Sequence, residues 1–441
     1  MPTETRTMFL NVGPSHPAMH GVIQLVLELD GERVVGGDVE IGFLHRGFEK
    51  MCEQGPYNNA IPYTDRLNYV SPLINNVGYC LAIEKLLGIT VPERCQYIRV
   101  LMSEISRITD HLTCIGASAM ELGSFTVFLY MIKAREFLWE LVEAVTGARL
   151  TISYGRVGGV KADLPVGFAD RARLALKEVR NVLTEADKLL TRNRIFFDRM
   201  KDVGVLSAED AVAYSVTGPF LRATGVNYDV RKAFPYCVYD RLQFDVPLGE
   251  HGDNLDRYYV RMEEMAQSMR IIEQCLTQMP AGPINVDFEG RVMPAAEMVD
   301  RAKLGDTEGL KQWAVALDPT LEGGTKPFFD RINVHDRHVT LPPKEDTYGH
   351  IEGLMQHFKL VMIGHGLRPP RGEVYVPVEG ANGELGFYVV SDGSDRPYRV
   401  HVRAPCFTIM QALPDILVGD MLADVAPTFG SVNMIAGELD R

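Results

Sequence analysis

The chain has 441 residues, of which 46 % are hydrophobic and 23 % are charged, an ordinary composition for a globular protein. This length provides for roughly two to three domains of about 150 residues each. The 45 basic and 58 acidic residues give a formal net charge of −13. Such an acidic balance argues against non-specific binding to nucleic acid and against direct adhesion to anionic lipid.

The seven cysteines are scattered, and no two of them form a C-x-x-C pair. An odd number without close pairs predicts neither a disulfide framework nor a thiolate metal site. We therefore expect free, buried thiols in a reducing compartment.

The first residues, Met1–Thr7, contain no apolar signal core. The segment closest to a membrane span is 113–132, which carries Glu121 near its middle. Because a lone central carboxyl is costly in lipid, we expect a buried pair of helices there. Any connection to a membrane then runs through partner proteins.

The first elements in chain order form a β-meander over residues 8–47, in which two apolar runs flank the turn Asp30-Gly31-Glu32-Arg33. Helical periodicity follows over 64–144, and Pro92 marks a helix start because proline needs no backbone donor there. A turn rich in glycine and arginine at 154–159 interrupts this pattern. Further helices are predicted over 168–199 and 255–278.

The second part of the chain is mixed over 281–345, helical over 347–363 and strand-like over 373–402, with a hairpin turn at 380–383. The apolar segment that follows is expected to be irregular. The predicted class is α+β, a mainly helical body with small antiparallel sheets near the N-terminus and in the C-terminal region. We divide the chain into four segments, 1–62, 63–280, 281–345 and 346–441.

Common cofactor motifs are absent from the sequence, which has no G-x-G-x-x-G after a strand, no P-loop and no H-E-x-x-H. We therefore expect no NAD, FAD or ATP bound by this chain. His335 and His338 form an H-x-x-H pair in a polar segment and are expected at the surface, with metal ligation as the minor alternative. His350 and His357 share a predicted helix face and are expected in the core or at an interface.

The loop from Gly13 to Gly21 contains two of the eleven histidines, His16 and His20, and joins two predicted strands. Its prolines restrict the backbone, and its terminal glycines permit tight turns. Because histidine exchanges a proton near neutral pH, the loop is suited to hold a proton donor in place.

Two more segments carry candidate functional residues. One is 42–50 at a strand-to-helix junction, and the other is 64–69, which is expected to open a helix. Each also has a plain structural explanation. Arg46 could pair with an acid, Asp65 could cap its helix, and Tyr69 could be a core tyrosine.

Taken together, the motifs form a long ordered series: GPSHPAMHG, IGFLHRGFEK, PYTDRLNYV, EKLLGI, RVGGV, RATGVNYDVRK, VSDGSDRPYR, RAP and GELDR. This series resembles the quinone-site subunit of respiratory complex I, known as the D-type chain in bacteria and the 49-kDa chain in mitochondria. That family is homologous to the large subunit of nickel–iron hydrogenases. The resemblance extends over essentially the whole chain.

The resemblance implies that a quinone headgroup lies between His20 of the loop and Tyr69, which it places on a helix. An imidazole and a tyrosine hydroxyl can each hydrogen-bond one quinone carbonyl oxygen and deliver a proton to it. His16 would support the loop. The family usually pairs the histidine with an aspartate, and this chain has Glu121 there, an acid of the same charge and longer reach.

Other residues receive supporting roles from the same resemblance. Arg46 and Arg66 match arginines near the terminal iron–sulfur cluster and the quinone site, and Arg46 corresponds to a position that is methylated in some relatives. Asn433, Ile435 and Glu438 match positions that line the quinone cavity. The segment 1–62 would carry the quinone-site loop, and 346–441 would close the cavity.

The resemblance also implies partners. No cofactor or metal would be bound by this chain alone; quinone would be the substrate at an interface, and a 4Fe–4S cluster would lie in a small B-type (PSST-type) subunit. Further partners would be a 30-kDa C-type subunit, other hydrophilic-arm subunits and a membrane H-type subunit. The complex would be a proton-pumping NADH:quinone oxidoreductase, with this chain peripheral on the cytoplasmic side of the bacterial inner membrane.

Two other classes stay open at this point. A large subunit of a hydrogenase-type or ferredoxin-linked complex is the first, but a true hydrogenase holds nickel and iron by thiolates of two C-x-x-C pairs. The corresponding sites here read Arg46-Gly47-Phe48-Glu49 and Ser431-Val432-Asn433-Met434, without a cysteine. A non-catalytic scaffold, the second class, would make the pair of His20 and Tyr69 incidental. Neither the quinone nor the electron donor follows from this chain.

Overall fold

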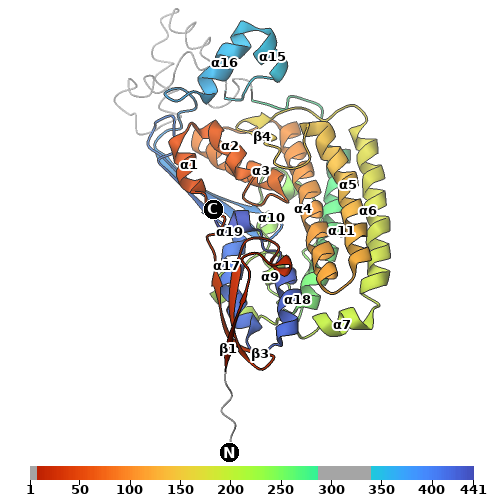
Figure 1. The fold of residues 1–441 in the computed structure, drawn as a ribbon. Helices are drawn as coiled ribbons and strands as arrows, with labels where there is room; N and C mark the ends of the chain where they lie inside the picture. The colour runs from red at the N-terminus through yellow and green to blue at the C-terminus, as the bar shows by residue number, and fades with distance from the viewer. Residues whose placement is uncertain (1–6, 287–338) are drawn as a thin grey trace, which may run out of the picture.

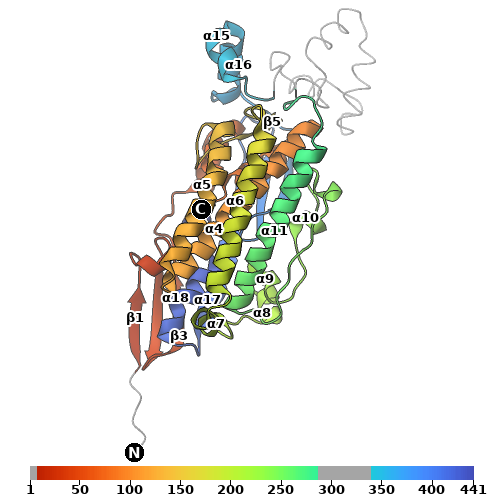
Figure 2. The same ribbon diagram turned by 90° about the vertical axis from the view of Figure 1, so that its right-hand side faces the viewer.

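The computed structural model describes residues 7–286 and 339–441. Its body is a layer of long helices that lie side by side, with a small sheet at one end and a second sheet against its flank (Figures 1 and 2). The long helices are α4 (Glu93–Glu121), α5 (Phe125–Thr146), α6 (Phe168–Leu190) and α11 (Asn254–Gln278). The predicted α+β class is confirmed.

The central helix of the layer is α4, which begins directly after Pro92, as predicted, and is buried along most of its length. It turns into α5 at Gly123, whose φ of +84° suits glycine. The predicted helix pair over 113–132 is thus confirmed, but it is not wholly buried, because Phe125 and Leu129 are 56 % and 50 % exposed. Within residues 7–286 and 339–441, no helix has the length and apolar character needed to cross a membrane.

The N-terminal sheet has the order β1-β2-β3, with β1 (Met8–Val12), β2 (Gln24–Asp30) and β3 (Arg33–Glu40) all antiparallel. Burial alternates along β2, so that every second side chain faces a core formed with the C-terminal helices. The predicted hairpin is confirmed. The β1–β2 loop therefore ends beside α18 (Leu422–Val432) (Figure 1).

A group of shorter helices links this sheet to the body: α1 (Phe48–Gln54), η2 (Tyr57–Ala60), α2 (Ile61–Thr64) and α3 (Pro72–Leu87). The prediction that 64–69 opens a helix is wrong. Thr64 ends α2, and the next helix begins only at Pro72, so Tyr69 lies in the connecting loop. The physical reason is that proline fits the first helical turn, while the turn before it is held by side chains rather than by a helical ladder.

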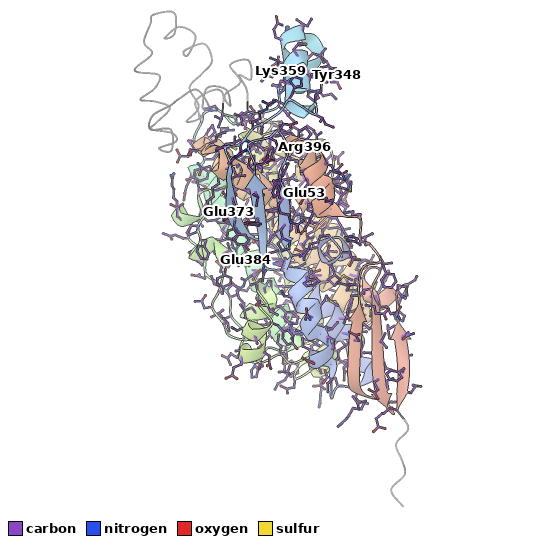
Figure 3. The ribbon with its side chains drawn as sticks, turned by 90° about the vertical axis from the view of Figure 1, so that its left-hand side faces the viewer. Glu53, Tyr348, Lys359, Glu373, Glu384 and Arg396 are labelled. Carbon is purple, nitrogen blue, oxygen red and sulfur yellow. The ribbon has the colours of Figure 1, made fainter. Side chains whose placement is uncertain are left out.

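The C-terminal sheet consists of β6 (Gly372–Glu379), β7 (Glu384–Ser391) and β8 (Arg399–Arg403), and the predicted hairpin turn between β6 and β7 is confirmed. Figure 3 shows Glu373 and Glu384 on this sheet, which lies above the N-terminal sheet. Helix α3 packs on its inner face so closely that a methyl group at Gly78 would lie 2.8 Å from the Phe387 ring.

The segment after β8 contradicts the expectation of irregular structure. It forms α17 (Pro405–Leu417), α18 and α19 (Ala436–Leu439). Pro414 and Pro427 lie inside the first two helices and weaken their local signal. The helices form nonetheless because their apolar sides are buried against the N-terminal sheet.

The remaining predictions need smaller corrections. The stretch 168–199 is not one helix, because α6 ends at Leu190 and Asn193 caps a new helix. The stretch 347–363 is likewise divided by the extended residue His350. His350 is exposed and His357 is partly exposed, so neither lies in the core. The remaining short elements are β4 (Gly155–Arg156), β5 (Gly159–Val160), α7 (Arg194–Met200), α8 (Ala208–Ala213), α9 (Pro219–Arg222), α10 (Val230–Ala233), η3 (Tyr239–Arg241), α15 (Lys344–Gly349) and α16 (Ile351–Val361).

Other sequence predictions concern metal and sulfur. His335 and His338 lie outside the described residues. All seven cysteines are free thiols, as predicted, and only Cys237 is not fully buried. Burial raises the pKa of Cys52 and Cys80 to about 12, so these thiols keep their protons. Among the residues that the structure describes, no cluster of histidine, cysteine and acidic side chains could hold a metal ion.

The helical body and the C-terminal sheet are joined by a buried ion network. Glu104, Arg107 and His111 of α4 meet Glu264 of α11, Arg222, Asp229, Arg231 and Glu379, and all eight are less than 3 % exposed. Arg222 contacts Glu264 and Glu379, and His111 Nε2 lies 2.8 Å from Glu264 Oε2. Buried charges are tolerated only when paired in this way. The network therefore joins α4 and α11 to the segment 222–231 and to the end of β6.

Candidate functional site

His20 lies at the tip of the N-terminal sheet, where the short helix η1 (Pro17–Met19) ends. His16 caps this helix by accepting a hydrogen bond from the Ala18 amide at its Nδ1, and its side chain is exposed. His20 adopts the left-handed region, with φ 48°, which turns the chain sharply after η1. The imidazole consequently faces the end of α4.

Glu121, near the end of α4, is the residue that meets His20. The His20 Nε2 and Glu121 Oε1 atoms lie 2.8 Å apart, with side chains 17 % and 5 % exposed. The two groups do not satisfy the geometry of a hydrogen bond, so the contact is a close approach rather than an aligned bond. The contact predicted from the resemblance is present although the acid is a glutamate.

The environment of Glu121 acts on its pKa in two opposite directions. Burial raises the pKa of Glu121, and the nearby His20 and His16 act in the opposite direction. Its second oxygen, Oε2, has no hydrogen-bond partner and lies against Gly430 of α18, where a methyl group would be 2.2 Å away. Glu121 is thus a buried carboxyl that contacts His20 through one oxygen and the α18 backbone region through the other.

Tyr69 occupies a loop that is fixed on both sides. Asn68 and Ser71 each donate a hydrogen bond to Asp110 Oδ2 of α4, at 3.0 and 2.8 Å. The tyrosine is half-buried. Burial and the neighbouring Cys406 and Asp110 raise its pKa, so the hydroxyl keeps its proton at neutral pH.

Asp110 is a residue that the sequence analysis did not single out. It is fully buried and also accepts a hydrogen bond from Asn433 Nδ2 at 2.7 Å. The sequence signal for its role was the position of an aspartate between the apolar residues Ile108 and Leu112, since a buried acid must have partners.

Arg46 and Arg66 lie together near the Tyr69 loop. Arg46 Nη2 donates to the Arg66 carbonyl oxygen at 2.5 Å, and Arg66 itself is exposed. Burial and the positive charge of Arg66 lower the pKa of Arg46. Because two guanidinium groups lie close together beside the Tyr69 loop, this part of the protein suits a negatively charged neighbour.

The remaining predicted residues lie on the segment around α19. Asn433 has φ 57° and donates to Asp110 and to Asn382, and Ile435 is buried. Glu438 is buried beside Cys406, whose thiol donates to it. Burial raises the pKa of Glu438 to about 7, a shift that the contact with Cys406 opposes.

The raised pKa of Glu438 predicts a pH-dependent stability difference. A carboxyl that prefers its neutral form in the folded state loses folding free energy as pH rises from its ordinary 4.5 to about 7. We expect Glu438→Gln to become more stable than the parent over this interval, by about 3 kcal/mol at the upper end, because one pKa unit is worth about 1.4 kcal/mol. Urea denaturation at a series of pH values measures this difference, and a difference that is constant with pH would contradict it.

The structure thus places the predicted residues on five segments. His20 contacts Glu121 directly, Arg46 contacts Arg66, and Tyr69 and His20 lie on loops that both pack on the segment around α19. Apolar side chains of the flanking strands and loops are exposed, among them Val22, Ile41, Phe43 and Leu44, at 36 to 48 %. An exposed apolar rim of this kind is typical of a surface covered by another protein.

These features define a class of protein: a helical α+β protein with an imidazole–carboxylate contact and a protonated tyrosine on neighbouring loops, beside exposed apolar side chains. The model for the family described as "Respiratory-chain NADH dehydrogenase, 49 Kd subunit" matches residues 121–312 and 323–441. The chain belongs to this family, whose members are subunits of an oxidoreductase complex.

Individual relatives agree with this assignment. The chain is 51 % identical to the first D-type subunit of the NADH-quinone oxidoreductase of Sorangium cellulosum, over 98 % of this chain and 95 % of that protein. It is 50 % identical to the D-type NADH-quinone oxidoreductase subunit of Myxococcus xanthus, over 99 % and 94 %. It is also 48 % identical to the combined C/D-type NADH-quinone oxidoreductase subunit of Bdellovibrio bacteriovorus, over 98 % of this chain and 68 % of that longer protein.

Proposed function

We propose that this chain is the quinone-site subunit of a proton-pumping NADH:quinone oxidoreductase and that the quinone headgroup binds between His20 and Tyr69. The observation that carries the proposal is the 2.8 Å contact of His20 with the buried Glu121. Such a pair can hold a proton for transfer at neutral pH. Its position beside an exposed apolar rim suits an apolar substrate at a subunit interface.

The histidine side of the site acts through charge. Reduction of a quinone by two electrons places negative charge on both carbonyl oxygens, and each oxygen takes up a proton. His20 donates one proton, and Glu121 holds the imidazole in place and stabilises its protonated form. Burial raises the pKa of Glu121, and His20 and His16 oppose this shift, which suits Glu121 to a part in the proton transfer.

The tyrosine side acts through a fixed hydroxyl. The loop that carries Tyr69 is tied to Asp110, which limits its movement. The hydroxyl donates the second proton, which it still holds at neutral pH because its pKa is raised. Electrons would be supplied by a 4Fe–4S cluster of the small B-type partner, beside which Arg46 and Arg66 would balance negative charge.

The proposed partners follow from the same placement. The Bdellovibrio relative, whose name combines the C and D types, supports a C-type neighbour. The exposed apolar rim supports coverage by the B-type subunit, while a membrane H-type subunit and other hydrophilic-arm subunits would complete the complex. Together they would hold this chain on the cytoplasmic side of the bacterial inner membrane.

The experiment that tests this function is Glu121→Gln in the assembled complex. We expect the turnover number for quinone to fall at least tenfold, since the protonated His20 loses its counter-charge, with a smaller change in KM. The pH above which turnover declines should move downward for the same reason. Steady-state kinetics with a soluble quinone from about pH 6 to 9 measure both effects.

The matched control is Glu121→Asp, which keeps the charge and shortens the side chain by one methylene group. It should retain more turnover than Glu121→Gln. If Glu121→Gln leaves turnover unchanged at every pH, the proposed role of the pair is wrong. Co-purification of the chain without a redox partner or membrane subunits would instead favour the scaffold alternative.

A further inference from the structure

The segment 433–441 contacts all three loops of the proposed site, and every residue from Asn433 to Asp440 is buried. We call these nine residues the C-terminal clamp. Its contacts with the three loops are made by Met434, Ala436, Gly437 and Asp440, which the sequence analysis did not assign to the site. We propose that the clamp sets the position of Tyr69 relative to His20, with Gly437 as the positioning residue. This inference rests on the proposed function and deepens it.

The first contact is with the His20 loop. Gly21, the residue after His20, lies so close to the clamp that a methyl group on it would be 3.3 Å from both Ala436 Cβ and Met434 Cε. This distance is slightly tighter than ordinary van der Waals contact, which leaves the loop little room to approach the clamp further.

The second contact is tighter and involves Tyr69. A methyl group at Gly437 would lie 2.3 Å from the Arg66 carbonyl oxygen, 2.7 Å from the Leu67 carbonyl oxygen and 3.3 Å from Tyr69 Cδ1. Helix α19 therefore packs tightly against the backbone just before Tyr69 and against the Tyr69 ring. Only glycine fits without moving this backbone.

The third contact is with the loop that carries Arg46. Asp440 accepts hydrogen bonds from the amides of Gly42 and Leu44 at its two carboxylate oxygens, at 2.8 and 2.7 Å. The Arg66 carbonyl oxygen, which faces Gly437, also accepts from Arg46. A displacement at Gly437 would therefore move Tyr69 and the two arginines together.

The clamp is itself anchored to the body. Asn433 binds Asp110, which also binds the residues on either side of Tyr69, so the clamp and the Tyr69 loop share one carboxylate. Adjacent residues, Ala436 and Gly437, then face the two loops that carry the proton donors. Because Ala436 and Gly437 are neighbours at one helical turn, the spacing between the two loops is fixed.

The test is Gly437→Ala in the assembled complex. Gly437 does not have a positive φ, so alanine suits its backbone, and the substitution acts only through the contact. The new methyl group has to displace the Arg66 carbonyl by about 1 Å to reach ordinary contact distance. We expect kcat/KM for a water-soluble short-chain quinone to fall between about tenfold and a hundredfold, since a shift of this size has that cost.

The control is Gly349→Ala, in α15, where a methyl group would meet nothing within 4 Å and φ is not positive. It should leave kcat/KM unchanged. Gly21→Ala is an intermediate case, because its methyl group meets only side-chain atoms, and a smaller loss is expected. It also serves as the test if Gly437→Ala lowers the yield of the complex.

A double-mutant cycle separates positioning from a general structural defect. If Gly437 acts through Tyr69, adding Gly437→Ala to Tyr69→Phe causes little further loss. Full additivity of the two losses, or unchanged kcat/KM in Gly437→Ala with the complex intact, would overturn the inference while leaving the proposed function in place. An unaffected Tyr69→Phe would instead overturn the proposed function.

Discussion

Replacing Tyr69 with phenylalanine should abolish nearly all quinone reduction while the complex still assembles. The change removes one hydroxyl group and leaves the ring, so the packing of the ring against Gly437 is kept. A positioned proton donor contributes about 10²- to 10⁴-fold to a rate, and turnover should fall by a factor in this range. Turnover of the purified complex with a soluble quinone measures the loss.

A second tyrosine provides the matched control. Tyr154 is buried, and its hydroxyl donates to the Ala162 carbonyl oxygen at 2.6 Å; neither residue is assigned to the proposed site. Tyr154→Phe deletes the same atom and costs a structural hydrogen bond, so it should reduce stability slightly and leave turnover unchanged. Near-normal turnover in Tyr69→Phe, with the native quinone, would remove Tyr69 from the mechanism.

The largest effect on stability is expected from Glu264→Ala. Glu264 is fully buried, accepts a hydrogen bond from Arg222 Nε at 2.9 Å and lies 2.8 Å from His111 Nε2. Its loss leaves a buried guanidinium without one of its acids. Breaking a buried pair in this way costs about 3 to 5 kcal/mol, a large fraction of the roughly 5 to 15 kcal/mol that holds a typical domain folded.

The destabilisation caused by Glu264→Ala should depend on pH, and the pKa of Glu264 gives the direction. Burial would raise the pKa of Glu264, but Arg222 and His111 lower it well below its usual range. The stabilisation is therefore present above the ordinary carboxyl pKa of 4.5 and is lost as pH falls. Urea denaturation should show that Glu264→Ala is most destabilising near neutral pH and less so in acid.

An exposed ion pair serves for comparison. Glu143 contacts Arg149 on the surface of α5, where both side chains are more than 40 % exposed. Glu143→Ala should change the urea midpoint little, because water screens such pairs. Equal effects of Glu143→Ala and Glu264→Ala would show that the buried network does not carry the stability assigned to it.

The network also explains a motif to which the resemblance assigns no role. Arg222, Asp229 and Arg231 all belong to the RATGVNYDVRK segment. In the structure these three side chains face α4 and α11 and pair with acids from both helices or with one another. Their role is to join elements of the body.

Much of the secondary structure followed from local patterns in the sequence. The hairpin between β2 and β3 and the hairpin between β6 and β7 were predicted because apolar runs flank turns that contain glycine. Helix α11 was predicted because its apolar period is long and ends at a proline. Such signals lie within a few residues of one another and need no tertiary contact.

The misplaced elements have a common physical cause. Pro414 and Pro427 weaken the local signal for α17 and α18, and burial against a distant sheet compensates for it. Tyr69 was expected on a helix, but hydrogen bonds from its neighbours to Asp110, which is distant in the chain, hold it in a loop. Local sequence patterns, which span only a few residues, contain no information about such distant partners.

The sequence by itself determined that His20, Tyr69 and Glu121 stand at the positions for which we propose proton transfer, because residue types and motif order are local properties. It also determined the family resemblance and the absence of thiolates at the hydrogenase positions. Only the tertiary structure decided that Glu121 reaches His20, at 2.8 Å. It alone placed Gly437 and Asp110 against the Tyr69 loop, because these contacts join segments that are distant in the chain and depend on how the helices pack.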